Sequence, residues 1–174
     1  MNKKISIVIP VYCNQESLKI LFERLILLEK NLKRKYKLTT EIIFIDDGSY
    51  DNSWDILLLI KKKRPSTKVI RLTRNFGGVH AVKIGFQNIT GDAFTMLAAD
   101  LQDPPELILD MANQWLKGNR FVICEREIRN DSFLKIFFSH IYYKIIRLLV
   151  IKDYPMGGFD LALMDRVFLP YLQK

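Results

Sequence analysis

Carboxylate side chains follow two apolar runs of the sequence, and they are the residues best suited to bind a metal or a diphosphate. Asp46 and Asp47 come directly after the run 41–45, and Asp100 follows the run 93–98. Oxygen ligands from one or two carboxylates, completed by a substrate diphosphate, are the usual environment of Mg²⁺. Acidic groups that gather on a protein of net charge +8 also need a cation or hydrogen-bond donors to offset their repulsion. These positions predict a site for a divalent cation and a diphosphate.

Both acidic segments also have a simpler structural interpretation. The segment IDDGSYD at 45–51 consists largely of turn formers and is compatible with a plain turn in which Asp51 caps the next helix. The segment DLQDPPE at 100–106 is compatible with a helix start, with Asp103 as the cap, although this leaves Asp100 unexplained. His80 and His140 have no partner residues in the sequence, and neither is assigned a role.

Strand patterns alternate with helix patterns through the first 125 residues. Repeated strand-then-helix units specify a mostly parallel sheet with right-handed crossovers and helices on both faces. Ligands of such sheets bind at the carboxyl ends of the strands, so the predicted fold brings the acidic residues to one edge. Strands are predicted over 5–11, 41–45, 68–72, 93–98 and 121–124, and helices over 17–32, 53–64, 79–87 and 105–116.

The composition indicates one basic α/β domain. Lys and Arg outnumber Asp and Glu 27 to 19 in 174 residues, which suits simple solubility but also nucleic acid, anionic lipid or phosphorylated substrates as partners. Nucleic acid is the least favoured of these, because the basic residues are scattered and no aromatic-basic recognition motif is present. Cys13 and Cys124 lie outside any metal-binding pattern, so neither zinc nor a disulfide framework is predicted and a reducing compartment fits best.

The alternation ends beyond residue 126. Residues 133–150 are rich in Phe, Tyr, Ile and Leu, with Lys135, Lys144 and Arg147 placed to share one narrow face of a helix. This amphipathic helix suits either a core or subunit interface, or a membrane interface with its basic stripe among phosphates. The N-terminal run is too short for a signal-peptide core, and no run reaches the roughly 18 apolar residues of a membrane span. We therefore expect a cytoplasmic protein, peripheral to the inner face of the membrane and able to form a homo-oligomer.

Five segments together resemble family 2 glycosyltransferases of the GT-A fold, in particular the bacterial enzymes similar to dolichol-phosphate mannose synthase. The resemblance covers almost the whole chain and implies one GT-A domain, with a nucleotide-sugar-binding core over 1–125 and an acceptor-side segment over 126–174. It also implies transfer of a sugar from a nucleotide-sugar, with UDP favoured, to polyprenyl phosphate in cell-envelope glycan synthesis. Mg²⁺ or Mn²⁺ would be the cofactor. The matching segments are IVIPVY at 7–12, FIDDGSYD at 44–51, RNFG at 74–77, ADLQDPPE at 99–106 and GGFDLALMDR at 157–166.

The resemblance implies roles for individual residues. Asp100 and Gln102 would hold the metal and the diphosphate. Arginines suit phosphate groups because a guanidinium binds phosphate oxygens in a fork. Arg129 and Arg166 join Asp100 and Asp160 as the implied catalytic residues. The implied donor-binding residues are Pro10, Val11, Tyr12, Glu16, Asp46, Asp47, Ala99, Asp100 and Arg126.

The sequence departs from the family pattern in three places. The DAD metal motif is replaced by Ala98, Ala99 and Asp100, a form that is familiar in this bacterial branch. Gln15 stands where the family usually has glutamate, and the acid follows at Glu16. Relatives commonly continue into amphipathic and membrane-spanning helices, whereas this chain ends at Lys174. We therefore expect that part of the acceptor site and a membrane anchor are lacking.

Two further hypotheses remain open. A sugar hydroxyl as acceptor would need a protein base, for which Asp160 is the candidate, whereas a phosphate acceptor is already anionic and needs none. Alternatively, the chain is a non-catalytic module that binds nucleotide and transfers nothing.

Overall fold

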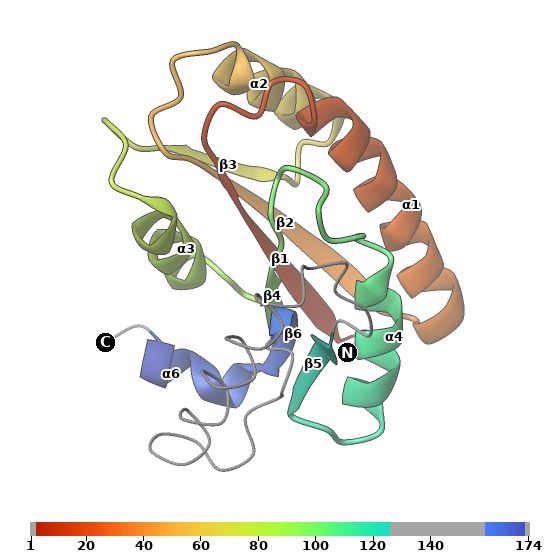
Figure 1. The fold of residues 1–174 in the computed structure, drawn as a ribbon. Helices are drawn as coiled ribbons and strands as arrows, with labels where there is room; N and C mark the ends of the chain where they lie inside the picture. The colour runs from red at the N-terminus through yellow and green to blue at the C-terminus, as the bar shows by residue number, and fades with distance from the viewer. Residues whose placement is uncertain (1–2, 126–158, 173–174) are drawn as a thin grey trace, which may run out of the picture.

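A twisted sheet forms the centre of the protein, in the strand order β3-β2-β1-β4-β6-β5 (Figure 1). The computed structural model describes residues 3–125 and 159–172. The first four strands of this order run parallel, as the sequence predicts. The strands are β1 (Lys4–Val11), β2 (Thr39–Asp46), β3 (Lys68–Arg71), β4 (Ala93–Met96), β5 (Phe121–Glu125) and β6 (Phe159–Asp165).

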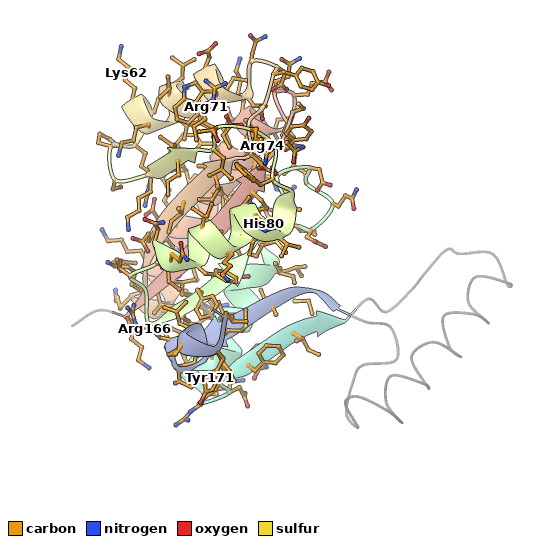
Figure 2. The ribbon with its side chains drawn as sticks, turned by 90° about the vertical axis from the view of Figure 1, so that its left-hand side faces the viewer. Lys62, Arg71, Arg74, His80, Arg166 and Tyr171 are labelled. Atoms are coloured by element: carbon orange, nitrogen blue, oxygen red, sulfur yellow. The ribbon has the colours of Figure 1, made fainter. Side chains whose placement is uncertain are left out.

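Helices cover both faces of the sheet, as predicted. The helices α1, α2 and α4 lie on one face, and α3 and α6 lie on the other. Figure 2 shows the second face, with α3 and its His80 in front of the sheet. The predicted helix over 133–150 lies outside the described residues. The helices are α1 (Leu18–Tyr36), α2 (Ser53–Lys63), α3 (Gly78–Gln87), α4 (Leu107–Leu116), the 3-10 turn η1 (Arg166–Phe168) and α6 (Leu169–Leu172).

Strand β6 was not predicted and changes the far side of the sheet. It pairs antiparallel with β4, where Ala93 lies opposite Asp165, and antiparallel with β5, where Cys124 lies opposite Leu161. It therefore separates β4 from β5. Because β6 runs against its neighbours, it begins at the carboxyl edge of the parallel strands and ends at their amino edge.

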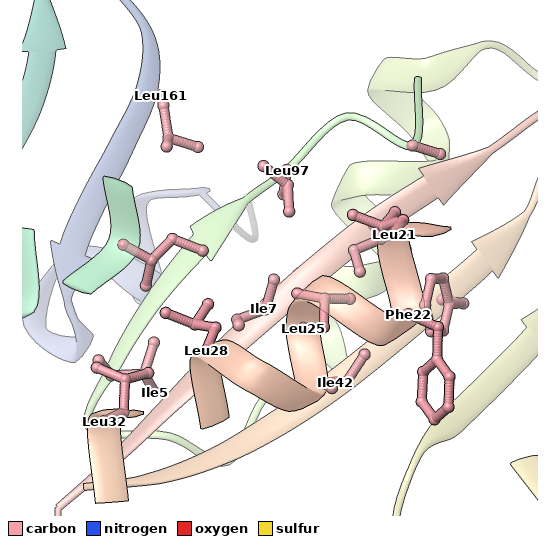
Figure 3. Packing of buried hydrophobic residues seen from close by; sticks show 14 of the residues in the cluster. Ile5, Ile7, Leu21, Phe22, Leu25, Leu28, Leu32, Ile42, Leu97 and Leu161 are labelled. Atoms are coloured by element: carbon pink, nitrogen blue, oxygen red, sulfur yellow. The ribbon is translucent and has the colours of Figure 1, made fainter. Parts of the chain in front are cut away.

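The larger core lies between α1 and the sheet. The fully buried side chains of Leu21, Leu25 and Leu28 on α1 pack toward Ile5 and Ile7 of β1 (Figure 3). Their helical spacing gives α1 one continuous apolar stripe. The strands are apolar on both faces, because helices cover both sides of a parallel sheet. This packing holds the carboxyl ends of β1, β2 and β4 at one edge.

Glu41 ties the four parallel strands together at the opposite, amino edge. Its carboxylate accepts hydrogen bonds from Ser6 Oγ at 2.6 Å, from Thr90 N at 2.8 Å and from Thr90 Oγ1 at 2.9 Å. Lys68 Nζ adds an ion pair at 2.8 Å. Burial raises the pKa of Glu41, but the hydrogen bonds from Lys68, Ser6 and Thr90 outweigh it and hold the pKa below its usual value.

We predict that Glu41→Gln destabilises the protein near neutral pH by about 2 kcal/mol, because hydrogen bonds to a charged acceptor are replaced by weaker ones. Because the pKa of Glu41 is lower in the folded than in the unfolded state, its ionised form stabilises the fold above the unfolded pKa of about 4.3. This stabilisation is lost as the pH falls through the folded pKa. The difference between variant and wild type should therefore shrink below about pH 4. Urea unfolding at several pH values measures it. Glu23→Gln, at an exposed position on α1, is the control, and a Glu41→Gln deficit independent of pH would contradict the prediction.

Candidate active site

A cleft of about 330 Å³ lies at the carboxyl edge of the parallel strands. Four chain segments contribute to it, each following one of the strands β1, β2, β3 and β4. Asp47 and Asp100 therefore face the same cavity although they are far apart in the sequence. The lining residues are Pro10, Val11, Tyr12, Asn14, Asp47, Asn75, Gly77, Gly78, Ala98, Ala99 and Asp100.

A second cleft, of about 400 Å³, adjoins the first. Asn14 and Asp100 line both cavities, so the two clefts adjoin at these side chains. Tyr50 and Asp51 form part of the second cleft, together with the loop 13–17 that leads into α1. Glu16, an implied donor contact, lines this second cleft and not the first.

Asp47 joins the loop after β2 to the loop before α3. Its Oδ1 accepts the backbone N–H of Phe76 at 2.8 Å, and its Oδ2 accepts that of Gly77 at 2.9 Å. Gly48 has φ +70°, and a Cβ there would lie 2.5 Å from the carbonyl carbon of Arg74. The two backbones thus pack in direct contact, which only glycine permits. This junction positions Asn75, Gly77 and Gly78 as one wall of the first cleft.

Asp46 does not line either cleft, which corrects the interpretation of this residue as a wall of the donor pocket. Its side chain is 0% exposed, and its Oδ1 accepts the N–H of Ser49 at 3.2 Å. Its Oδ2 lies 3.2 Å from Arg71 Nε, in an ion pair. Arg71 also lies over the ring of Trp54, 5.2 Å from its centroid. Asp46 therefore fixes the end of β2 from within, and Asp47 takes the place in the cleft.

Asp100 is the exposed carboxylate of the first cleft. Its Oδ1 accepts the N–H of Gln102 at 3.1 Å, which closes a tight turn around Leu101 at φ 65°. Ser17 Oγ donates to Ala99 O at 2.6 Å and so ties this turn to the start of α1. The remaining lone pairs of the carboxylate are available to a ligand.

A divalent cation fits this arrangement in one particular way. Over residues 3–125 and 159–172, no group of three or more His, Cys, Asp and Glu side chains is placed to hold a metal. Mg²⁺ and Mn²⁺ sites do not need such a group when a substrate diphosphate and waters supply the other oxygens. Asp100, with its exposed carboxylate, suits an ion that arrives with its nucleotide. Gln102 is also exposed beside it.

The loop after β1 is held by hydrogen bonds to the loop after β2. Cys13 N donates to Ser49 Oγ at 3.0 Å, and Asn14 N donates to Ser53 Oγ at 2.8 Å. Asp51 accepts from the N–H of Ser53 at 3.0 Å and from that of Gln15 at 3.2 Å. Burial raises the pKa of Asp51, but these hydrogen bonds outweigh it and lower the pKa below its usual value. Asp51 thus forms a turn before α2, as predicted, but it does not cap the helix, because the N-cap position is occupied by Asn52.

Arg166 lies away from both clefts. It follows β6, whose last residue pairs with the first residue of β4, and its Nη1 donates to Gly91 O at 2.9 Å. This is the amino edge of the sheet, and Figure 2 shows Arg166 and Arg74 at opposite ends of the molecule. The implied role of Arg166 at the substrate phosphates does not agree with this position. The antiparallel direction of β6 carries Arg166 to the wrong edge.

Asp160 lies near the start of β6, at the carboxyl edge. Its backbone is thus at the same edge as Asp100. Arg126 and Arg129, the other implied phosphate ligands, lie outside the described residues.

Some residues that line the clefts lie in the matching segments but had no predicted role, namely Asn75 and Gly77 in RNFG and Tyr50 in FIDDGSYD. Asn75, Gly77 and Gly78 line the first cleft, and Tyr50 lines the second. The paired glycines of RNFGG were a usable signal, because glycine permits a close approach of backbone and ligand. Tyr50 had no comparable signal.

Among the helices that the structure describes, none has the length and apolar character needed to span a membrane.

Comparison with known proteins decides the family. Residues 6–170 match the family described as glycosyl transferase family 2. The chain belongs to this family. An uncharacterized glycosyltransferase of Synechocystis is 38% identical over 168 residues, which is 95% of this chain and 51% of the relative. The undecaprenyl-phosphate 4-deoxy-4-formamido-L-arabinose transferase of Photorhabdus laumondii is also 38% identical over 168 residues, 95% of this chain and 49% of the relative. The chain thus spans about half the length of these relatives.

Solved structures show that this glycosyltransferase has the GT-A fold. A mannosyltransferase of Pyrobaculum calidifontis, in complex with GDP-Man and Mn²⁺, superposes with a TM-score of 0.61 at 20% identity over 99% of this chain and 47% of its own. Glucosyl-3-phosphoglycerate synthase of Mycobacterium tuberculosis gives 0.63 at 16% identity over 95% and 58%. Staphylococcus aureus TarS in complex with UDP gives 0.57 at 18% identity over 74% and 37%.

We predict that Asp47→Asn loosens the loop 74–78 of this glycosyltransferase. An amide presents one acceptor oxygen in place of two, so the junction loses one of its two hydrogen bonds to residue 47, worth about 1.5 kcal/mol for a charged acceptor. The Gly77 N–H also donates to Asn75 Oδ1 at 2.9 Å, so the loss should fall mainly on the contact with residue 47 and not leave this N–H without an acceptor. Hydrogen exchange of the amides of Phe76 and Gly77 should accelerate by about tenfold or more. Asp55→Asn, at an exposed position on α2, should leave exchange in this loop unchanged. Equal exchange in Asp47→Asn and wild type would show that the junction does not depend on this carboxylate.

Proposed function

We propose that this chain transfers a sugar from a UDP-sugar to polyprenyl phosphate. The observation that carries the proposal is the cleft lined by both Asp47 and Asp100, in a member of glycosyltransferase family 2. The undecaprenyl-phosphate transferases among its relatives, at 38% to 43% identity, support the acceptor class. The structural neighbour solved with UDP supports the donor class.

The first cleft suits the nucleoside part of the donor. Tyr12 is 43% exposed, so its ring is available to pack against the base or ribose. Asp47 is only 2% exposed, and it shapes this wall through its hydrogen bonds to Phe76 and Gly77. Pro10, Val11 and Ala99 complete the wall without charge. We assign the base and ribose to this region.

Asp100 is assigned to the diphosphate end of the donor. A divalent cation bound there would neutralise the charge that develops on the departing diphosphate. Within the chain itself, the turn at Leu101 and the hydrogen bond from Gln102 hold the Asp100 carboxylate at the mouth of the cleft. Arg126 and Arg129 follow β5 in the sequence and are proposed to bind donor or acceptor phosphates.

The proposed reaction is a direct displacement at the anomeric carbon of the donor sugar. An oxygen of the acceptor phosphate forms a bond to this carbon as the bond to the diphosphate breaks, and UDP leaves with the electron pair. A phosphate monoester is already anionic near neutral pH, because its second pKa is about 6. The protein therefore needs no base, and it acts by positioning the reactants and stabilising charge. We expect the enzyme to work at the anionic inner face of the membrane, where basic proteins and a lipid acceptor meet.

We predict that UDP and Mn²⁺ stabilise the protein cooperatively. Mn²⁺ alone should leave the melting temperature unchanged, because one exposed carboxylate binds the ion weakly. UDP with Mn²⁺ should raise the melting temperature more than UDP alone, because the ion lowers the Kd for UDP and stabilisation grows with the ratio of ligand concentration to Kd. A ligand at 100 times its Kd stabilises by about 2.7 kcal/mol. Asp100→Asn should abolish the increment due to Mn²⁺, as measured by thermal shift.

Asp110→Asn, at an exposed position on α4, provides the matched control and should respond like the wild type. A wild-type protein that is not stabilised by UDP at any concentration would refute donor binding. Stabilisation by Mn²⁺ alone would instead point to a preformed metal site.

The position of Asp160 keeps a second acceptor class under test. Its backbone lies at the edge that carries Asp100, where a base for a sugar hydroxyl would be needed. With polyprenyl phosphate as acceptor, we predict that Asp160→Asn retains transfer within about twofold of wild type, because this acceptor needs no protein base. Removal of a required general base would instead lower the rate about 10²- to 10⁴-fold. Radiolabelled sugar transfer measures it. A loss of that size, with transfer to an oligosaccharide in the wild type, would favour a hydroxyl acceptor.

A further inference from the structure

We propose that Tyr50 is a positioning residue that holds the ring of Tyr12 as a wall of the nucleotide cleft. The inference rests on the proposed function, because it assigns the nucleotide to the cleft that Tyr12 lines. It goes further by naming a residue outside that cleft on which donor affinity depends.

The two rings form an edge-on pair at the junction of the two clefts. Their centroids are 6.2 Å apart and their planes meet at 81°, a favourable arrangement for aromatic rings. Tyr12 lines the first cleft, and Tyr50 lines the second. Tyr50 therefore contacts Tyr12 without itself lining the first cleft.

Tyr50 has no role in the core that would explain its contacts. Its side chain is 84% exposed, so its removal should leave the stability of the fold nearly unchanged. Its only ring contact within the described residues is the edge-on contact with Tyr12. Its effect should therefore appear in ligand affinity.

Cys13 fixes Tyr50 relative to Tyr12. Its backbone adopts φ 54°, and its N–H donates to Ser49 Oγ at 3.0 Å. Ser49 directly precedes Tyr50 in the chain, so this hydrogen bond links the segment of Tyr12 to the segment of Tyr50. The loop that carries Tyr12 and the loop that carries Tyr50 are thus joined through Cys13, Ser49 and the two rings. Without the Tyr50 ring, Tyr12 would keep its place in the sequence but lose its lateral support.

The positioning role makes a specific prediction for donor binding. Tyr50→Ala should raise the Kd for UDP about threefold to tenfold, the size expected for one aromatic pair. With donor sugar, KM should rise while kcat stays unchanged, because Tyr50 does not touch the reacting atoms. Tyr50→Phe keeps the ring and should remain within about twofold of wild type.

A double-mutant cycle separates positioning from direct contact. If Tyr50 acts through Tyr12, the double variant Tyr12→Ala with Tyr50→Ala should bind UDP no more weakly than Tyr12→Ala alone. Strictly additive losses would mean that Tyr50 contacts the donor independently, and this would overturn the inference. Calorimetric titration of each variant with UDP and Mn²⁺ supplies the four Kd values.

The chain offers a matched control in Tyr171. This tyrosine of α6 is 74% exposed and lies at the other end of the molecule from Arg74 (Figure 2). Tyr171→Ala should leave the Kd for UDP unchanged. An equal effect in Tyr171→Ala and Tyr50→Ala would also overturn the inference.

A ligand-free readout distinguishes failure of this inference from failure of the proposed function. The Tyr12 ring resonances in the NMR spectrum of the unliganded protein should shift in Tyr50→Ala and stay in place in Tyr171→Ala. Unchanged Tyr12 resonances, or an unchanged Kd for UDP in Tyr50→Ala, would overturn the inference alone. A wild-type protein that does not bind UDP would overturn the proposed function and, with it, the effect on donor affinity claimed for Tyr50.

Discussion

The carboxylate of Asp47 accepts two consecutive backbone N–H groups from a loop about thirty residues away, and this contact holds one wall of the first cleft. Loops at the end of a parallel sheet lack the backbone hydrogen bonds that join the strands, so their positions depend on side-chain hydrogen bonds of this kind. Asp47 fixes the position of the loop 74–78 relative to the end of β2. Gly48 has no side chain, so its backbone can contact the backbone of Arg74. These two hydrogen bonds are partly buried, and a hydrogen bond to a charged acceptor is worth about 1.5 kcal/mol.

The three acidic residues of the site have different surroundings, and this divides their work. Asp46 is enclosed and paired with Arg71, and Asp47 is saturated in part by amides. Asp100 alone among the three is exposed. A basic protein can thus present one available carboxylate to a cation without gathering uncompensated negative charge. The same division explains why a nucleotide, and not the protein, would supply most of the ligands of a metal.

Much of the fold could be predicted because local patterns and fold-level rules agree. The apolar runs that form β1 and β2 and the leucine stripe of α1 are visible in the sequence, and the edge rule for parallel sheets correctly brought Asp47 and Asp100 together. Strand β6 was missed because its pairing with β4 and β5 is non-local. The prediction that Asp46 lines the donor pocket was wrong, although its neighbour Asp47 does line the cleft. Successive side chains at a strand end point in different directions. The placement of Arg166 failed because a motif does not reveal in which direction its strand runs.

The position of β6 between β4 and β5 also determines where this fold tolerates changes in chain length. Glu125 at the end of β5 lies opposite Phe159 at the start of β6, so the chain leaves the sheet and returns to it at neighbouring points beside the cleft. Insertions or deletions between these two points need not alter the register of any strand. A change of length there would leave the pairing of the six strands and the packing of α1 on the sheet intact.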